Sequence, residues 1–216
     1  MIKGFKGTYM SLGHFCATSE ILSRIGVRES GLFDWAENKR GLSAFVDVLT
    51  GAFQHNIENN LVWTSSICYD KMEDGVVEKI TRRVPCVNGL EFTHMPYHDI
   101  NQIKKTLMER ANKVKAFAES GGKFVYACLS NEEPYKGYVL DMLDVWFSQR
   151  GFDTDEKLLM IPYGVIDDYY NIPLSERVKH VDWLKEKLIE HNNAPLTIRS
   201  DYVEKYNNIE VDICKN

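Results

Sequence analysis

Cys16 has the sequence setting that most favours chemistry in this chain. It ends the run SLGHFC (residues 11–16), in which Gly13 predicts a tight turn just before the first turn of a helix. At a helix start, the helix dipole and the free backbone N–H groups stabilise an anionic sulfur and lower the thiol pKa. The same N–H groups can bind the oxyanion of an acyl-transfer intermediate. The pattern therefore predicts a thiolate nucleophile, with Ser11, Gly13 and His14 as the turn and oxyanion residues around it.

Three histidines are candidate partners of the Cys16 thiol. His14 lies two residues before it, His94 ends a predicted strand, and His98 stands next to Asp99 in a predicted loop. Each candidate also has a structural interpretation, as an exposed turn residue for His14 or a hydrogen-bonded core residue for His94. The same holds for Cys16, because free cysteines are among the most buried residues in proteins. The residues alone leave these alternatives open.

Two aspartates could complete such a site. Asp34 lies between Phe33 and Trp35, where a carboxylate is costly to bury unless it accepts hydrogen bonds. It is either the anchor of a loop or an acid close to Cys16. Asp99 directly precedes a predicted helix, so it is either the N-cap of that helix or a carboxylate that orients an imidazole.

The elements that would position these residues follow from the spacing of apolar residues. Helical spacing begins at about residue 15 and ends at Gly26, and Asn88-Gly89 predicts a turn between two strands. Further helices are predicted over residues 42–53, 101–118, 138–149 and 178–190, and strands over residues 7–12, 61–69, 77–82, 91–94, 123–129 and 157–161. We therefore expect an α/β (α+β) fold, a single domain over residues 1–216 with a mixed, partly antiparallel sheet packed with helices.

Composition excludes several functional classes. The net charge is −5 and basic residues alternate with acidic ones, which argues against a nucleic-acid partner. Five cysteines without a C-x-x-C pair predict neither a disulfide framework nor a zinc site. Without a P-loop or a G-x-G-x-x-G motif, we expect no metal and no cofactor. No signal-peptide pattern and no apolar run of about 20 residues occur, so we expect a cytoplasmic protein without membrane insertion.

Two motifs at a fixed separation carry a family resemblance. The run S-L-G-x-x-C ending at Cys16, followed by Phe33-Asp34-Trp35, is similar to the N-terminal signature of the bacterial family described as putative papain-like cysteine peptidases. That family continues with an F-x-H-D element, an arginine-containing helix and an apolar strand. The matching order here is Phe92-Thr93-His94, Arg110 and Phe124-Val125-Tyr126, so the resemblance covers residues 8–130. Leu32 replaces the usual proline before F-D-W, and Met95 stands where an aspartate often follows the histidine.

The resemblance implies a papain-like topology and a Cys–His pair, Cys16 with His94, acting on a peptide, amide or thioester as a hydrolase or acyltransferase. It implies an orienting side chain as well, for which Asp99 and Asn131 are the candidates. Papain-like sites usually carry a glutamine before the cysteine as an oxyanion donor, and Met10 stands at that place. The alternative is therefore a catalytically inactive papain-like binding module associated with glycan or surface-polysaccharide pathways. A third interpretation is a glycan-processing enzyme that uses Glu132 and Glu133, which a solvated loop explains equally well.

Overall fold

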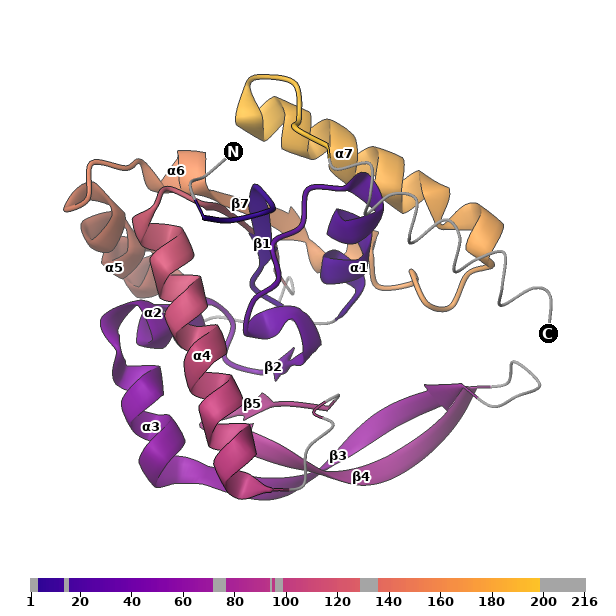
Figure 1. Ribbon diagram of the computed structural model, residues 1–216. Helices are drawn as coiled ribbons and strands as arrows, with labels where there is room; N and C mark the ends of the chain where they lie inside the picture. Colours follow the sequence, from indigo (N-terminus) through magenta and orange to yellow (C-terminus); the bar gives the residue numbers. More distant parts are fainter. Residues whose placement is uncertain are drawn as a thin grey trace.

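The computed structural model describes residues 4–13, 16–71, 77–93, 95, 99–128 and 136–198 (Figure 1). Three parallel strands form one sheet, in the order β1 (Tyr9–Ser11), β6 (Lys123–Cys128) and β7 (Leu158–Pro162). The side chains of β6 alternate between two hydrophobic clusters, with Phe124 and Tyr126 in one and Val125 and Ala127 in the other. A strand that is buried on both faces needs apolar residues at every position, which explains the continuous apolar run in its sequence.

Helices cover both faces of this parallel sheet (Figure 1). The face that includes Val125 packs against α1 (Cys16–Ile25) and α7 (Val178–Asn192). The opposite face packs against α2 (Leu42–Thr50), α4 (Ile100–Glu119) and α5 (Lys136–Ser148). The helix α3 (Ala52–Asn60) packs on α2 and α4, and the short α6 (Thr154–Lys157) leads into β7. The three layers place the start of α1 at one edge of the sheet, directly after β1.

A second, antiparallel sheet lies beside this core. Its strands follow the order β2 (Glu37–Asn38), β5 (Leu90–Glu91), β4 (Val77–Val87) and β3 (Leu61–Lys71). The predicted turn between β4 and β5 is confirmed, since Asn88 and Gly89 both have positive φ, at 47° and 84°. Strands β3 and β4 form a long hairpin that extends beyond the helices (Figure 1).

The mixed α+β class is confirmed, with its parallel and antiparallel strands divided between two sheets. The helix predicted over residues 42–53 is two helices, because Gly51 adopts φ +89 and ends α2 in the left-handed conformation. Three short 3-10 turns complete the described elements: η1 (Phe33–Trp35), η2 (Tyr163–Val165) and η3 (Leu174–Glu176). Over the described residues, no helix combines the length and the apolar character that crossing a bilayer requires.

Candidate functional site

The segment before Cys16 has the strand, turn and helix that its sequence predicts. Ser11 is the last residue of β1, and Cys16 is the first residue of α1. Gly13 has φ +83, and a side chain there would place its Cβ 3.3 Å from the Phe33 carbonyl oxygen. The Gly13 N–H donates to Ser11 Oγ at 3.1 Å, which closes the turn. Ser11 and Gly13 are thus turn residues, with Ser11 Oγ as the acceptor for the Gly13 N–H.

Cys16 is partly buried, and two polar side chains face its sulfur. Glu20 lies four residues further along α1 and therefore on the same face of the helix. Tyr170 comes from the segment between β7 and α7, and its hydroxyl lowers the pKa of Cys16 slightly, whereas the Glu20 charge raises it. Cys16, Glu20 and Tyr170 thus form a polar cluster near the start of α1 whose members influence one another electrostatically.

The prediction of a lowered thiol pKa is wrong for this structure. Burial raises the pKa of Cys16 to about 11, and the negative charges of Glu20 and Asp34 add to the increase. The backbone N–H at the helix start and the Tyr170 hydroxyl lower the pKa, but by less than burial raises it. Desolvation thus outweighs the hydrogen bonds that favour the thiolate. Cys16 is therefore a neutral thiol at neutral pH.

Glu20 is the centre of the polar cluster. Its Oε1 accepts hydrogen bonds from the Tyr169 hydroxyl at 3.0 Å and from Arg24 Nη2 at 2.9 Å. The Arg177 guanidinium lies 4.0 Å from the same oxygen and 5.1 and 5.5 Å from the ring centroids of Tyr169 and Tyr170. Burial, and then the Glu20 charge, raise the pKa of both phenols, so both hydroxyls keep their protons.

The segment that carries the two tyrosines is anchored to α7. Asp168 Oδ1 lies 3.0 Å from Nε2 of the buried His180, whose ring meets the Tyr169 ring edge-on at a centroid separation of 5.8 Å. Tyr169 itself is fully buried, whereas 45% of the Tyr170 surface is exposed. The anchor therefore fixes Tyr169 in the core, while the neighbouring Tyr170 lies partly at the surface.

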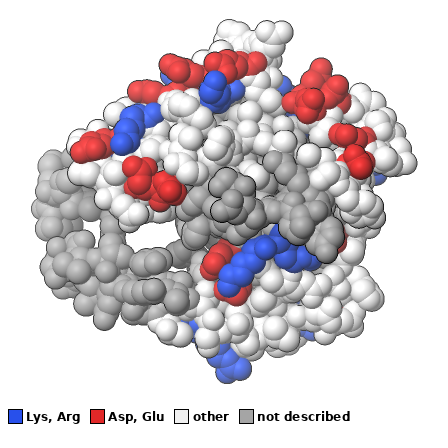
Figure 2. Space-filling model, turned by 180° about the vertical axis from the view of Figure 1, so that it is seen from behind, with Lys and Arg blue, Asp and Glu red and all other residues white. Residues whose placement is uncertain are grey.

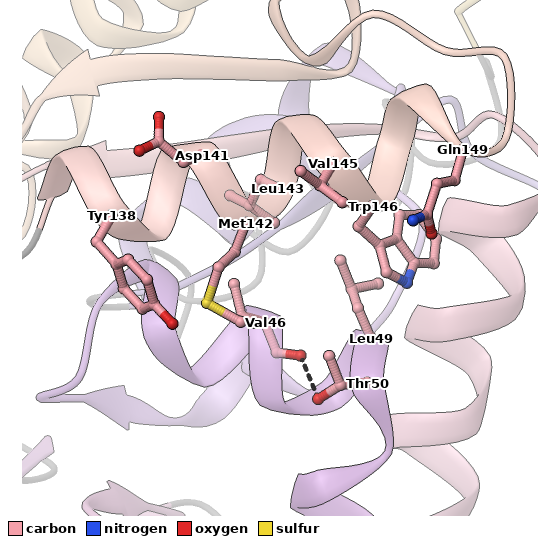
Figure 3. A pocket seen from close by; sticks show the side chains of 10 residues that line it. All are labelled: Val46, Leu49, Thr50, Tyr138, Asp141, Met142, Leu143, Val145, Trp146 and Gln149. Atoms are coloured by element: carbon pink, nitrogen blue, oxygen red, sulfur yellow. Dashed lines mark hydrogen bonds between the residues drawn. The ribbon is translucent and has the colours of Figure 1, made fainter.

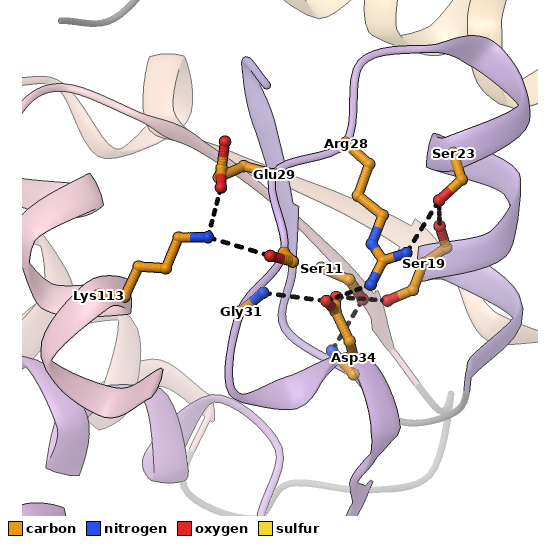
Figure 4. Close-up of polar contacts among 10 residues, drawn as sticks. Ser11, Ser19, Ser23, Arg28, Glu29, Gly31, Asp34 and Lys113 are labelled. Carbon is orange, nitrogen blue, oxygen red and sulfur yellow. Dashed lines mark hydrogen bonds and ion pairs between the residues drawn. The ribbon is translucent and has the colours of Figure 1, made fainter. Parts of the chain in front are cut away.

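Asp34 is buried in a hydrogen-bond network beside α1 (Figure 4). It pairs with the buried Arg28 and accepts hydrogen bonds from Ser19 Oγ at 2.7 Å and from the Gly31 N–H at 2.9 Å. Arg28 also donates to Ser23 Oγ at 3.1 Å. The loop-anchor interpretation of Asp34 is confirmed, and its charge still raises the pKa of Cys16.

Asp99 is the N-cap of α4, as its position before a helix predicts. Its carboxylate accepts the Asn101 N–H at 2.8 Å, and the residue is exposed. Figure 1 shows the first turn of α4 beside the antiparallel sheet, whereas α1 begins beside the parallel sheet. The structure therefore does not bring Asp99 and Cys16 together.

The other predicted site residues lie outside the described residues. These are His14, His94, His98, Asn131, Glu132 and Glu133. Phe92, two positions before His94, is described: its ring is buried and its N–H donates to the Pro85 carbonyl at 2.9 Å. The pairing of Cys16 with a histidine thus stays a prediction.

Sequence reasoning missed Glu20 and Tyr170. One signal for Glu20 was present, since Cys16, Glu20 and Arg24 recur every four residues along the predicted helix. Tyr170 lies 154 residues after Cys16 in the sequence, and no local pattern connects the two. Only the packing of the segment between β7 and α7 brings them together.

Two cavities lie apart from the Cys16 thiol. An apolar groove of about 450 Å³ runs between α2 and α5, lined by residues such as Leu49, Met142 and Trp146 (Figure 3). A polar cavity of about 270 Å³ lies between Ser30, Asp34 and residues of α4, where Lys113 donates to Ser30 Oγ at 3.0 Å.

Charged side chains of both signs lie next to one another on the face shown in Figure 2, without a continuous basic area among its coloured residues. Within the described ranges, no group of three or more histidine, cysteine, aspartate or glutamate side chains is arranged to hold a metal ion.

Comparison with known proteins gives one match. Residues 7–146 match the model of a family described as putative papain-like cysteine peptidase. The matched range contains the two motifs around Cys16 and Asp34, and it ends before Tyr169, Tyr170 and Arg177. Searches of curated proteins and of solved structures found no significant match.

Proposed function

The chain belongs to the family of putative papain-like cysteine peptidases, and on this premise we propose that it is a hydrolase or acyltransferase whose nucleophile is the Cys16 sulfur. The observation that carries the proposal is the position of Cys16. It is the first residue of α1, directly after the turn at Gly13, within the matched residues and partly exposed. A cysteine at a helix start presents its sulfur beside free backbone N–H groups, which is the arrangement that acyl transfer uses.

The reaction would begin with attack of sulfur on the carbonyl carbon of a peptide, amide or thioester. A thioester with Cys16 forms, and the amine or thiol of the substrate leaves with a proton. Water then releases the acyl group in a hydrolase, whereas a second amine, alcohol or thiol accepts it in an acyltransferase. Backbone N–H groups at the start of α1 would donate to the oxyanion that forms in this step.

A neutral thiol needs a base that removes its proton as the sulfur attacks. The Cys16 pKa of about 11 leaves only a small thiolate fraction at neutral pH. We propose His94 as that base, because it occupies the histidine position of the family motif that begins at Phe92. The carboxylates of Asp99 and Asp34 are already engaged, one in capping α4 and the other in the Arg28 pair. We therefore assign structural roles to both aspartates and propose no third catalytic residue beside Cys16 and His94.

The direct test is turnover of a panel of chromogenic substrates, one amide, one ester and one thioester. Cys16→Ala should reduce turnover by about a thousandfold or more, and His94→Ala by a comparable factor, because nucleophile and base act as a unit. Cys128→Ala is the matched control, since Cys128 is another partly buried cysteine outside any disulfide. Turnover that survives Cys16→Ala would contradict the proposal.

The raised thiol pKa specifically favours a second candidate, the non-catalytic binding module. A module of this kind keeps Cys16 as a packing residue and has no need of a thiolate. Acylation distinguishes the two candidates. A folded wild-type protein that forms no covalent adduct at Cys16 with any of the three substrates would support the module, and a thioester adduct observed by mass spectrometry would exclude it.

A further inference from the structure

We propose that the polar cavity beside α4 is a binding site for a carboxylate group, and that Arg110 is the residue that recognises it. The cavity has a volume of about 270 Å³, and its lining consists of Ser30, Gly31, Asp34, Glu109, Arg110 and Lys113. Cys16 is not among the lining residues. The inference therefore goes beyond the proposed function and does not depend on it.

The Arg110 guanidinium lines this cavity without a counter-ion. Over the described parts of the chain, its side chain forms no hydrogen bond, ion pair or ring contact. The residue is nevertheless partly buried, and burial removes part of the water that would otherwise solvate the charge. A guanidinium carries five N–H donors in a planar fork and stays protonated at neutral pH. Arg110 therefore offers a ligand both unsatisfied donors and an unbalanced positive charge.

The other cations around the cavity already have acidic partners. Lys113, one helical turn after Arg110 on α4, lies 2.5 Å from the Glu29 carboxylate (Figure 4). Arg28 pairs with Asp34, which lines the cavity. Each of these two pairs is neutral as a whole, so neither pair balances the charge of Arg110. A single negative charge on a ligand would balance it.

This charge count and the size of the cavity favour a carboxylate over a phosphate. A phosphate group carries a charge of about −1.5 to −2 at neutral pH, whereas a carboxylate carries −1 and pairs with one guanidinium through two parallel hydrogen bonds. The volume of about 270 Å³ is slightly below that of typical small-molecule sites, which begin at about 300 Å³. The ligand is therefore a small organic acid or the terminal residue of a peptide.

Two further donors line the same cavity. The Ser30 hydroxyl accepts a hydrogen bond from Lys113 at 3.0 Å and keeps its own proton for another acceptor. The Lys113 ammonium carries three protons, and within the described residues only Glu29 and Ser30 accept from it. One carboxylate can therefore bind the Arg110 fork together with one of these donors. Glu109 is the opposing charge, because its exposed carboxylate lines the same cavity and repels an anion.

The experiment is a titration of the ¹⁵N-labelled chain with sodium acetate, in which sodium chloride keeps the ionic strength constant. The NMR signals of the Arg110 Nε–H and of the Ser30 and Gly31 amides should shift and reach saturation, because a bound carboxylate orders the guanidinium and changes the surroundings of the cavity. In Arg110→Gln the two amide signals should no longer respond. Arg110→Lys keeps the charge but lacks the fork, so the affinity should fall about tenfold.

Glu109→Gln is the matched control, since it changes the neighbouring residue of the same cavity. Acetate affinity in this variant should stay the same or increase by up to about threefold, because a repelling charge is removed. Thermal unfolding without acetate tests the alternative that Arg110 is structural. Arg110→Gln should shift the unfolding temperature by less than about 2 °C, because no described side chain pairs with Arg110.

Three results would overturn the inference: shifts that do not saturate, equal acetate affinity in Arg110→Gln, or a large loss of stability in that variant without acetate. Two further probes identify the source of the carboxylate. Succinate that binds more tightly than acetate indicates a small organic acid, whereas a tripeptide that binds only with a free C-terminus, and not when amidated, indicates a peptide end. Cys16→Ala should bind acetate as the wild type does, so the test is independent of the proposed nucleophile.

Discussion

Asp34 and Glu20 are two carboxylates that contact α1, and they differ in what surrounds them. The Asp34 side chain is 1% exposed, and its oxygens are taken by Arg28, Ser19 and the Gly31 N–H. The Glu20 side chain is 22% exposed, and its charge raises the pKa of Cys16 more than the Asp34 charge does. A buried carboxylate with all its acceptor positions filled mainly fixes structure, whereas a partly exposed carboxylate one helical turn from Cys16 mainly influences the thiol.

The largest expected effect is on the stability that Asp34 provides. Asp34→Asn keeps the shape of the side chain but deprives the buried Arg28 of its counter-ion, so the free energy of unfolding should fall by about 3–5 kcal/mol. Urea denaturation measures the change. A loss below about 1 kcal/mol would contradict this prediction, because it would show that Asp34 does not contribute more to the free energy of unfolding than a partly exposed carboxylate such as Glu20.

Glu29 extends the comparison to acid pH. Burial alone would raise its pKa, but Lys113 and the N–H groups of Gly7 and Lys6 lower the pKa below its ordinary value. A carboxyl whose pKa is lower in the folded state stabilises the fold above its unfolded pKa, near 4.3, and loses that contribution as pH falls through the folded value.

Glu29→Gln should therefore cost about 2 kcal/mol at neutral pH and progressively less at acid pH, because the wild type loses the same contribution there. Thermal unfolding across this pH range tests the expectation. A difference between wild type and variant that is constant with pH would contradict the assignment of the lowered pKa to Glu29.

Glu20→Gln should affect reactivity more than stability. Removing the negative charge lowers the pKa of Cys16, because the Glu20 charge raises it. Cys16 alkylation at neutral pH should accelerate by about threefold or more. Unchanged or slower alkylation would contradict the assignment of this pKa increase to the Glu20 charge.

The smallest effect should come from a carboxylate at the surface. Glu190 pairs with Lys187 at 2.7 Å, but its side chain is 65% exposed. Glu190→Gln should change the free energy of unfolding by less than about 0.5 kcal/mol and should leave Cys16 alkylation unchanged. A larger change would show that the burial of a carboxylate in this protein does not determine its contribution to the free energy of unfolding.

The features that sequence predicts well are local. The turn at Gly13, the start of α1 at Cys16 and the capping of α4 by Asp99 each depend on a few neighbouring residues, and the structure confirms them. The sequence also predicts that Asp34 needs hydrogen-bond donors, because a carboxylate between two aromatic residues is costly to bury without them.

The features that sequence did not predict depend on packing between distant segments. The thiol pKa was expected to fall, because a helix start is visible in sequence and the desolvation of its sulfur is not. Tyr170 reaches Cys16 only after β7 pairs with β6 and α7 packs on α1. The division of the strands into two sheets has the same origin, since strand order depends on contacts between residues far apart in the sequence.

The central claim is that burial keeps Cys16 a neutral thiol in the resting protein. The measurement is the pH at which Cys16 alkylation reaches half its limiting rate in the wild-type protein, with Cys128 labelled in the same sample as an internal reference. The account predicts a midpoint near pH 11 for Cys16. A midpoint at or below the ordinary thiol value of about 8.5 would contradict it.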